Sequence, residues 1–199
     1  MNHYAASILL IILCCQTVYS QRSDNYFSPR IDWVSLEQAR LMNPEDVEHL
    51  KLKRNKANTL PGEIFIYTNL KSLSISGLRL KALPDEISIF KKLEFLDFSK
   101  NKIESLPLSF CELKSLEVIV ANRNPLGFLP YCMGELSNLV AIDLWDTDVS
   151  DLPESLQGVQ SLKVIDFQGV NLRIEEQELL QKRFSWVKFR FDKPCNCFK

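Results

Sequence analysis

Three aspartates recur on a common spacing that could bring carboxylates together. Asp143 and Asp166 are 23 residues apart, and Asp97 lies two such steps before Asp143. If each step is one turn of a repeating structure, Asp143 and Asp166 stand side by side, and a carboxylate pair is the minimum for glycoside hydrolysis. The repeating structure that we expect would present these carboxylates on a shallow open sheet. Such a sheet cannot keep water away from them or raise the pKa of one of them. We therefore expect the chain not to be an enzyme.

The other reactive side chains do not form a catalytic or metal-binding set. His3 lies in the N-terminal apolar stretch, and His49 lies far along the chain from Cys195 and Cys197. These residues can assemble neither a Cys-His nucleophile nor a shared zinc site. We expect no cofactor and no metal. Lys and Arg total 24 against 25 Asp and Glu, so no basic excess favours a nucleic-acid partner.

The first twenty residues have the composition of a signal peptide. No Lys, Arg, Asp or Glu precedes Arg22, and the apolar stretch 5–15 is short for a membrane span. Val18 and Ser20 suit the positions before a cleavage site, although the lack of an early basic residue leaves an uncleaved anchor as the alternative. Residues 1–20 are thus predicted to be removed from a secreted or periplasmic protein. No integral membrane segment is expected after cleavage, because no second long apolar run follows.

A 23-residue period organises most of the chain. Leu-Pro pairs mark it five times, at 60–61, 83–84, 106–107, 129–130 and 152–153. Repeats then begin at Val47, Leu70, Leu93, Leu116, Leu139 and Leu162, and the positions below are counted from these residues. Apolar residues recur at positions 1, 4, 6, 11, 14, 18 and 21. Positions 4 and 6 are alternate residues of a short strand and face one core, while positions 18 and 21 have helical spacing.

This pattern resembles the leucine-rich-repeat family over residues 47–172, in the class written LxxLxLxxNxLxxLPxxIxxLxx. The third repeat shows it clearly, with Leu93, Leu96, Phe98, Asn101 and Ile103 in phase. The resemblance implies an α/β solenoid, a curved horseshoe with a parallel sheet on its concave face and short helical or irregular arcs on its convex face. It also implies a non-catalytic binding protein. Asn at position 9 occurs only at Asn55, Asn101 and Asn124, so we expect a patchy asparagine ladder.

Segments with cap-like sequences flank the repeats. Residues 21–34 form a predicted flexible leader, and residues 35–46 a capping helix in which Ser35 and Gln38 have capping-box spacing. Residues 173–199 are expected to form a capping helix, a strand and a cysteine-containing tail. The lead-in 35–47 is similar to that of exported repeat proteins from Bacteroidota.

In this architecture positions 3, 5 and 7 make up the exposed concave face. The predicted ligand-binding residues there are Phe95, Asp97, Val118, Val120, Asn122, Asp143, Trp145, Val164 and Asp166, and a secondary basic edge consists of His49, Lys51 and Lys53. The apolar members, together with Ala141, are expected to form an exposed patch, and such a patch usually marks a partner. We expect another protein as that partner, with Trp145 as the anchor. The alternatives are a glycan stacked on Trp145, a structural role without a ligand, and apolar side chains that only stiffen the sheet.

Four cysteines remain after the predicted cleavage. Cys111 and Cys132 are 21 residues apart, close to one full repeat, so they lie near one another across a repeat boundary. If they lean toward each other they can form a disulfide, and if they lean apart they cannot. Cys195 and Cys197 are expected to be free or intermolecular thiols.

Overall fold

The computed structural model describes residues 26–192, which fall into two units that divide after Arg30. Residues 26–30 of the first unit contain no helix or strand. The second unit, from Ile31 onward, holds the repeats and both flanking segments. The predicted signal peptide, Cys195 and Cys197 lie outside the described residues.

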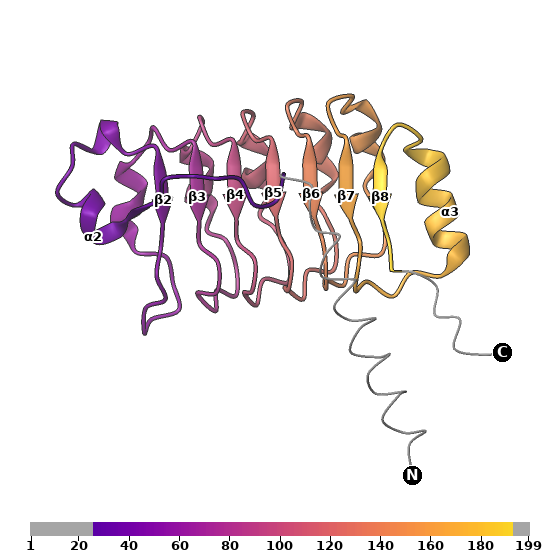
Figure 1. Ribbon diagram of the computed structural model, residues 1–199, viewed down its shortest axis with the longest axis horizontal. Helices are drawn as coiled ribbons and strands as arrows, with labels where there is room; N and C mark the ends of the chain where they lie inside the picture. Colours follow the sequence, from indigo (N-terminus) through magenta and orange to yellow (C-terminus); the bar gives the residue numbers. More distant parts are fainter. Residues whose placement is uncertain (1–25, 193–199) are drawn as a thin grey trace, which may run out of the picture. The chain divides into compact units, whose positions relative to one another are not determined.

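The repeats form one open parallel sheet whose strands follow the order of the sequence. The strands, side by side in Figure 1, are β1 (Val34–Ser35), β2 (His49–Lys51), β3 (Ser72–Ser74), β4 (Phe95–Asp97), β5 (Val118–Val120), β6 (Ala141–Asp143), β7 (Val164–Asp166) and β8 (Lys188–Arg190). From β2 to β7, each strand pairs with the residues 23 positions later, as in Leu73 with Leu96. The predicted solenoid is therefore confirmed.

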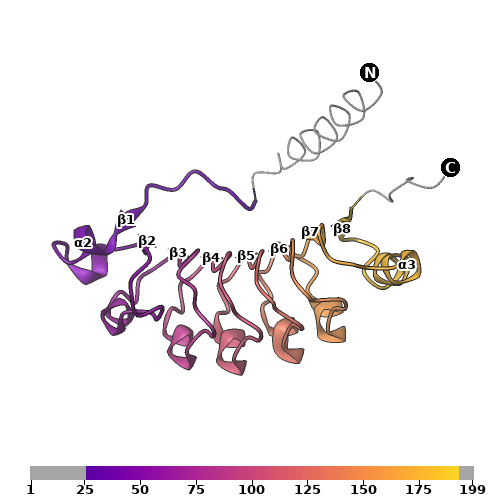
Figure 2. The same ribbon diagram turned by 90° about the horizontal axis from the view of Figure 1, so that it is seen from below.

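Each coil returns to the next strand through one 3₁₀ turn. These turns are η2 (Gly62–Ile66), η3 (Asp85–Ile89), η4 (Leu108–Glu112), η5 (Tyr131–Glu135) and η6 (Glu154–Gly158). The position-15 proline caps each one, from Pro61 to Pro153, because its fixed φ and missing N–H suit the start of a helical turn. Figure 2 shows the strands along the inner side of the curve and the turns along the outer side.

The core lies between the sheet and the 3₁₀ turns. Positions 4, 6, 18 and 21 are buried in every complete repeat, as Leu96, Phe98, Phe110 and Leu113 show. No coil can bury these side chains alone, so the coils must stack. The 23-residue period is thus also the period of the core.

From β2 to β7 the strands cover positions 3 to 5, so position 6, which was expected in the strand, follows it. The backbone turns because position 8 is left-handed in five consecutive repeats, at Gly77, Lys100, Arg123, Asp146 and Gly169. Asn101 and Asn124 then join coils: their side-chain oxygens accept the N–H of Leu80 and Ile103 in the preceding coil, at 3.0 Å. Asn55 instead bonds within its own loop. The asparagine ladder is patchy, as predicted.

Both ends of the sheet are covered by short elements. Helix α2 (Leu36–Ala39) begins with the predicted capping box between Ser35 and Gln38 and is followed by η1 (Pro44–Asp46). Strand β1, which the sequence did not predict, pairs with β2. Helix α3 (Ile174–Arg183) precedes β8, and Phe189 of β8 and Phe191 just after it stack with Phe167 of the last coil.

Candidate functional site

The expected exposed apolar patch on the concave face is wrong for most of its members. Phe95, Val120 and Val164 are only 8%, 5% and 2% exposed, and Ala141 is fully buried. Val118 and Trp145 are the members that remain partly exposed. Adjacent strands bring side chains of the same position close enough to cover one another. Two partly exposed apolar side chains therefore remain, Val118 in β5 and Trp145 in the turn after β6, and they do not form one patch with the other predicted members.

Part of the face is covered by Trp33, which the sequence placed in the flexible leader. The rings of Trp33 and Phe95 have centroids 6.2 Å apart and are tilted by 58°. Trp33 directly precedes β1, so pairing of Val34 and Ser35 with β2 fixes where its indole lies. No sequence signal predicts this contact, because β1 has only two residues.

The three aspartates at position 5 hold the ends of their strands. Each accepts the backbone N–H two residues later at 3.0 Å: Asp97 from Ser99, Asp143 from Trp145 and Asp166 from Gln168. Asp143 and Asp166 are neighbours in the sheet, as predicted, yet they are only 1% and 0% exposed. The expectation that these two carboxylates border an exposed surface is therefore wrong.

Side-chain donors satisfy the second oxygen of each of these carboxylates. Asn122 donates to Asp143 at 2.6 Å, and the hydroxyl of Ser74 donates to Asp97 at 2.9 Å. Arg190 of β8 lies 3.5 Å from Asp166. A buried carboxylate such as Asp143 or Asp166 needs such partners, and Asp97 keeps the same bonds while partly exposed.

Arg123 and Trp145 form a stacked pair next to Asp143. The guanidinium carbon of Arg123 lies 4.4 Å from the ring centroid of Trp145. The backbone of Trp145 is held on both sides, because its N–H donates to Asp143 and its carbonyl accepts the N–H of Arg123 at 2.9 Å. Arg123 was not predicted, because it occupies position 8 and the concave face was expected to consist of positions 3, 5 and 7.

The predicted basic edge lies on the first coil, apart from the stacked pair. His49 and Lys51 belong to β2, and Lys53 follows that strand, whereas Trp145 follows β6. Both lysines are exposed, and His49 is partly buried, with no hydrogen-bond partner for Nδ1 among residues 26–192. Next to it, the hydrogen bond from Lys71 lowers the pKa of Glu48. The structure does not bring the two sets of predicted residues together.

Cys111 and Cys132 form a disulfide with their Cα atoms 5.9 Å apart. The two side chains lean toward each other, and the bond joins η4 to η5 on the convex side. Within residues 26–192, no three His, Cys, Asp or Glu side chains are grouped so that they could hold a metal ion. No helix in this part of the chain is both long and apolar enough to cross a membrane.

Comparison with known proteins agrees with this geometry. A family model described as a leucine-rich repeat region matches residues 22–185, so the chain belongs to the leucine-rich-repeat family. Members of this family generally serve as scaffolds for protein interaction. Among curated proteins, no sequence matches the chain.

Solved structures share the fold. A leucine-rich-repeat protein of Leptospira interrogans is 26% identical, with a TM-score of 0.64 over 73% of this chain and 36% of its own. An internalin of Listeria monocytogenes is 16% identical, with a TM-score of 0.58 over 73% of this chain and 41% of its own. The chain thus spans well under half the length of either protein.

Proposed function

We propose that this chain is an exported, non-catalytic binding protein that recognises another protein through its concave face, with Arg123 and Trp145 at the centre of the contact. The observation that carries the proposal is the stacked pair itself. Trp and Arg are the residue types most enriched at the energetic centres of interfaces. Here both lie in the turns that follow β5 and β6, where a backbone hydrogen bond joins them, so less conformational entropy is lost on binding.

The carboxylates support a non-catalytic role. Asp97, Asp143 and Asp166 accept hydrogen bonds from backbone N–H groups and neighbouring side chains. A general acid or base must exchange a proton with a substrate within hydrogen-bond reach. These side chains instead hold the strand ends in place, and Asp143 and Asp166 do so while buried.

Export is supported by the signal-like residues 1–20 and by the Cys111–Cys132 disulfide, a bond that persists mainly in oxidising compartments. Mass spectrometry of the protein recovered from envelope and culture fluid should find Gln21 at its N-terminus. Recovery of the uncleaved chain from the cytoplasm alone would contradict export.

The binding proposal is tested by comparing immobilised variants in a pull-down from envelope and culture fluid. Trp145→Ala should remove the captured protein, at a cost of about 2 kcal/mol or more in binding, with little change in the melting temperature. Tyr131→Ala, which removes a 73% exposed aromatic from the convex side, is the matched control and should leave capture intact.

Capture that is unaffected by Trp145→Ala would overturn this proposal. A glycan array run in parallel separates the two classes of ligand. Trp145-dependent binding to glycans without any captured protein would replace the protein partner by a carbohydrate.

A further inference from the structure

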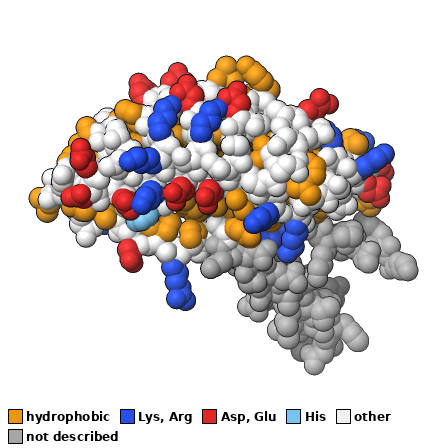
Figure 3. All heavy atoms as spheres, turned by 90° about the horizontal axis from the view of Figure 1, so that it is seen from above, with side chains coloured by type: hydrophobic (Ala, Val, Ile, Leu, Met, Phe, Trp, Pro, Cys, Tyr) orange, Lys and Arg blue, Asp and Glu red, His pale blue; other side chains and the backbone are white. Residues whose placement is uncertain are grey.

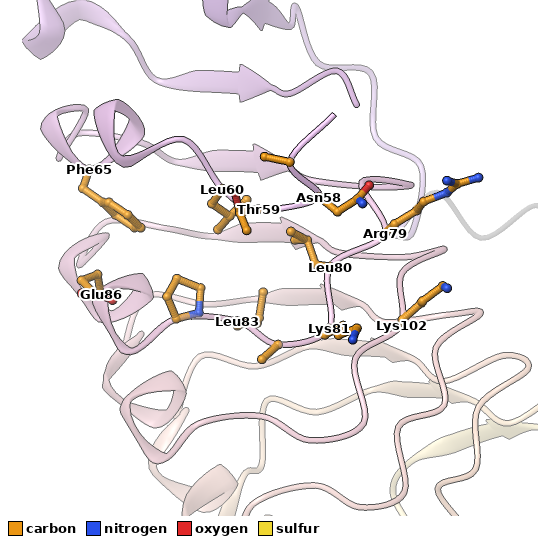
Figure 4. Close-up of a pocket in the computed structure, with 13 residues that line it drawn as sticks. Asn58, Thr59, Leu60, Phe65, Arg79, Leu80, Lys81, Leu83, Glu86 and Lys102 are labelled. Atoms are coloured by element: carbon orange, nitrogen blue, oxygen red, sulfur yellow. The ribbon is translucent and has the colours of Figure 1, made fainter. Parts of the chain in front are cut away.

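A cleft of about 650 Å³ lies beside the ends of the first strands, on the loops that follow β2 and β3. Its walls come from residues 57–65 of the first coil and 79–86 of the second, with Lys102 from the third (Figure 4). This volume is within the range of small-molecule sites, about 300–1,000 Å³. None of the predicted concave-face residues lines it.

The cleft coincides with a small side chain at position 11 of the first coil. Position 11 is Leu80, Ile103, Leu126, Val149 or Leu172 in the later repeats, and all five are buried. In the first repeat it is Ala57, which is exposed. Truncating a large apolar side chain leaves a space unless the surroundings collapse.

The loops of the first two coils also lack the bonds that join later loops. Asn101 and Asn124 each link their coil to the one before, and the N–H of Lys102 donates to the carbonyl of Leu80 at 2.7 Å. The second repeat has Leu78 at the asparagine position, and Asn55 bonds only to Thr59 and Asn58 of its own loop. Within the described chain, no hydrogen bond joins residues 57–59 to residues 79–83. The two loops are therefore not held together by hydrogen bonds at this point.

The lining has an apolar floor and a basic end. Leu60, Phe65, Leu80 and Leu83 form the floor, and Figure 4 shows Arg79 and Lys102 at the end of the cleft away from Phe65. Arg79, Lys81 and Lys102 are exposed and take part in none of the ion pairs found within residues 26–192. Glu86 is the one acidic lining residue and lies near Phe65. An occupant with an apolar body and an anionic head matches this arrangement.

The charge pattern elsewhere in the molecule makes these cations unusual. Where the chain enters the strands, neighbouring coils place opposite charges together, as in Lys91 with Glu112 at 2.8 Å. Figure 3 shows basic and acidic side chains lying next to one another on one face. Arg79 and Lys102, which line the cleft, and Lys56 next to its lining occupy position 10 of three consecutive coils and carry charge of the same sign. Like charges on neighbouring coils repel, and an anion bound between them removes that cost.

Two of the five described non-glycine residues with positive φ, Asn58 and Arg79, line the cleft. Their φ angles are 54° and 63°. The other described non-glycine residues with positive φ are Lys100, Arg123 and Asp146, and all three are at position 8. Residues held in this conformation are costly and often cluster at ligand sites. In the other repeats, position 10 keeps a negative φ.

We propose that this cleft binds an amphipathic anion, an alkyl chain that ends in a phosphate or carboxylate. The alkyl chain lies on Leu60, Phe65, Leu80 and Leu83. The anionic head lies between Arg79, Lys81 and Lys102. This site is separate from the concave face and does not depend on the protein partner proposed above.

The test is isothermal titration of the full mature chain with dodecyl phosphate below its micellar concentration. We expect saturable one-to-one binding that weakens as salt is raised. Dodecyl maltoside, which has the same tail without charge, and inorganic phosphate, which is the head alone, should each bind at least about tenfold more weakly. Equal affinity for dodecyl maltoside would overturn the proposal.

Two variants locate the binding. Ala57→Leu restores the side chain that the other coils carry, so the chain should remain folded while the cleft is filled and binding is lost. Arg79→Gln combined with Lys102→Gln should weaken binding by about tenfold or more. The matched control, Lys91→Gln with Lys114→Gln at the other edge of the strands, should bind as the wild type does.

Vesicles of anionic phospholipid distinguish a free ligand from a lipid headgroup. The proposal predicts that monomeric dodecyl phosphate competes with the vesicles and that Ala57→Leu binds neither. Binding of the wild type to vesicles alone, or wild-type affinity in Ala57→Leu, would assign the effect to surface charge and overturn the cleft as the site.

Discussion

Each position-5 aspartate stabilises the end of its strand by accepting the N–H of the residue two positions later. Asp143 is the most fully described example, since it accepts from the Trp145 backbone at 3.0 Å and from the Asn122 amide at 2.6 Å while buried. Hydrogen bonds to a charged, buried acceptor are stronger than neutral ones. The same side chain thus fixes the position of the tryptophan that we place at the centre of the binding face.

Asp143→Ala should lower the free energy of unfolding by about 2–3 kcal/mol, because it leaves the Trp145 N–H and the Asn122 amide without their acceptor. Chemical denaturation followed by circular dichroism measures the change. Asp148→Ala, an exposed aspartate in the same coil, is the control and should cost less than about 0.5 kcal/mol. Similar losses in the two variants would contradict this role.

At this scale the sequence predicted some side chains well and others poorly. Asn101 and Asn124 join neighbouring coils as expected, because their role depends only on the repeat position. The burial of Asp166 and Val164 could not be predicted, since it depends on β8, on Arg190 and on how neighbouring side chains cover one another. The contact of Trp33 with Phe95 depends on a two-residue strand too short to give a sequence pattern.

The 3₁₀ turns of neighbouring coils pack closely at one point. A Cβ added to Gly134 of η5 would lie 2.4 Å from the backbone oxygen of Ser155 in η6, so no side chain fits there. Gly158, at the end of η6, has open space around it. The stacking of η5 on η6 therefore requires a glycine at one of these positions and not at the other.

Gly134→Ala should destabilise the protein by about 2 kcal/mol or more, because backbone atoms must move apart to relieve the overlap. Gly158→Ala should be neutral or slightly stabilising, since it reduces the entropy of the unfolded chain. Thermal unfolding of the two variants makes the comparison. Equal melting temperatures would show that the turns do not pack as described.

The disulfide between Cys111 and Cys132 cross-links η4 to η5. Closing a loop between residues 21 apart in sequence stabilises a protein by about 3 kcal/mol. The double variant Cys111→Ser with Cys132→Ser should lose about this amount under oxidising conditions and should match the reduced wild type. Peptide mapping without reductant checks the bond directly, and alkylation of both cysteines in the exported protein would contradict it.

Across the whole molecule, exposed ion pairs connect consecutive coils. Arg40 pairs with Glu63, Lys71 with Glu48, and Lys91 with Glu112. In each pair the hydrogen bond from the basic partner lowers the pKa of the glutamate. A lowered carboxyl pKa contributes stability that is fully present above the unfolded-state pKa and is lost as the pH falls through the folded-state pKa.

The difference in melting temperature between wild type and the triple variant Glu48→Gln, Glu63→Gln and Glu112→Gln should therefore be largest near neutral pH. It should shrink as the pH falls from about 5 to 3, where the wild-type carboxyls become protonated. High salt should also reduce it, because all three pairs are exposed to solvent. A difference that grows on acidification would contradict the sign of these pKa shifts.

The repeating part of the fold was predictable because the same pattern of apolar residues occurs in six repeats. Leu-Pro pairs fix the register, and the apolar positions fix which side chains face the core. The cleft at Ala57 was not predicted, although the departure is visible in the sequence. Whether a small residue at position 57 leaves a cleft depends on how the loops of the first two coils pack, and the sequence pattern does not specify that packing.

The central claim is that a protein partner binds the concave face at the Arg123–Trp145 pair. The most direct measurement is photo-cross-linking in the native cells, with p-benzoylphenylalanine in place of Gln168, which follows the strand next to that of Trp145. We predict a discrete cross-linked protein that disappears when Trp145→Ala is added, and no such product when the photoreactive group replaces Tyr131 on the convex side. Cross-linking from Tyr131 alone, or cross-linking from Gln168 that survives Trp145→Ala, would contradict the account.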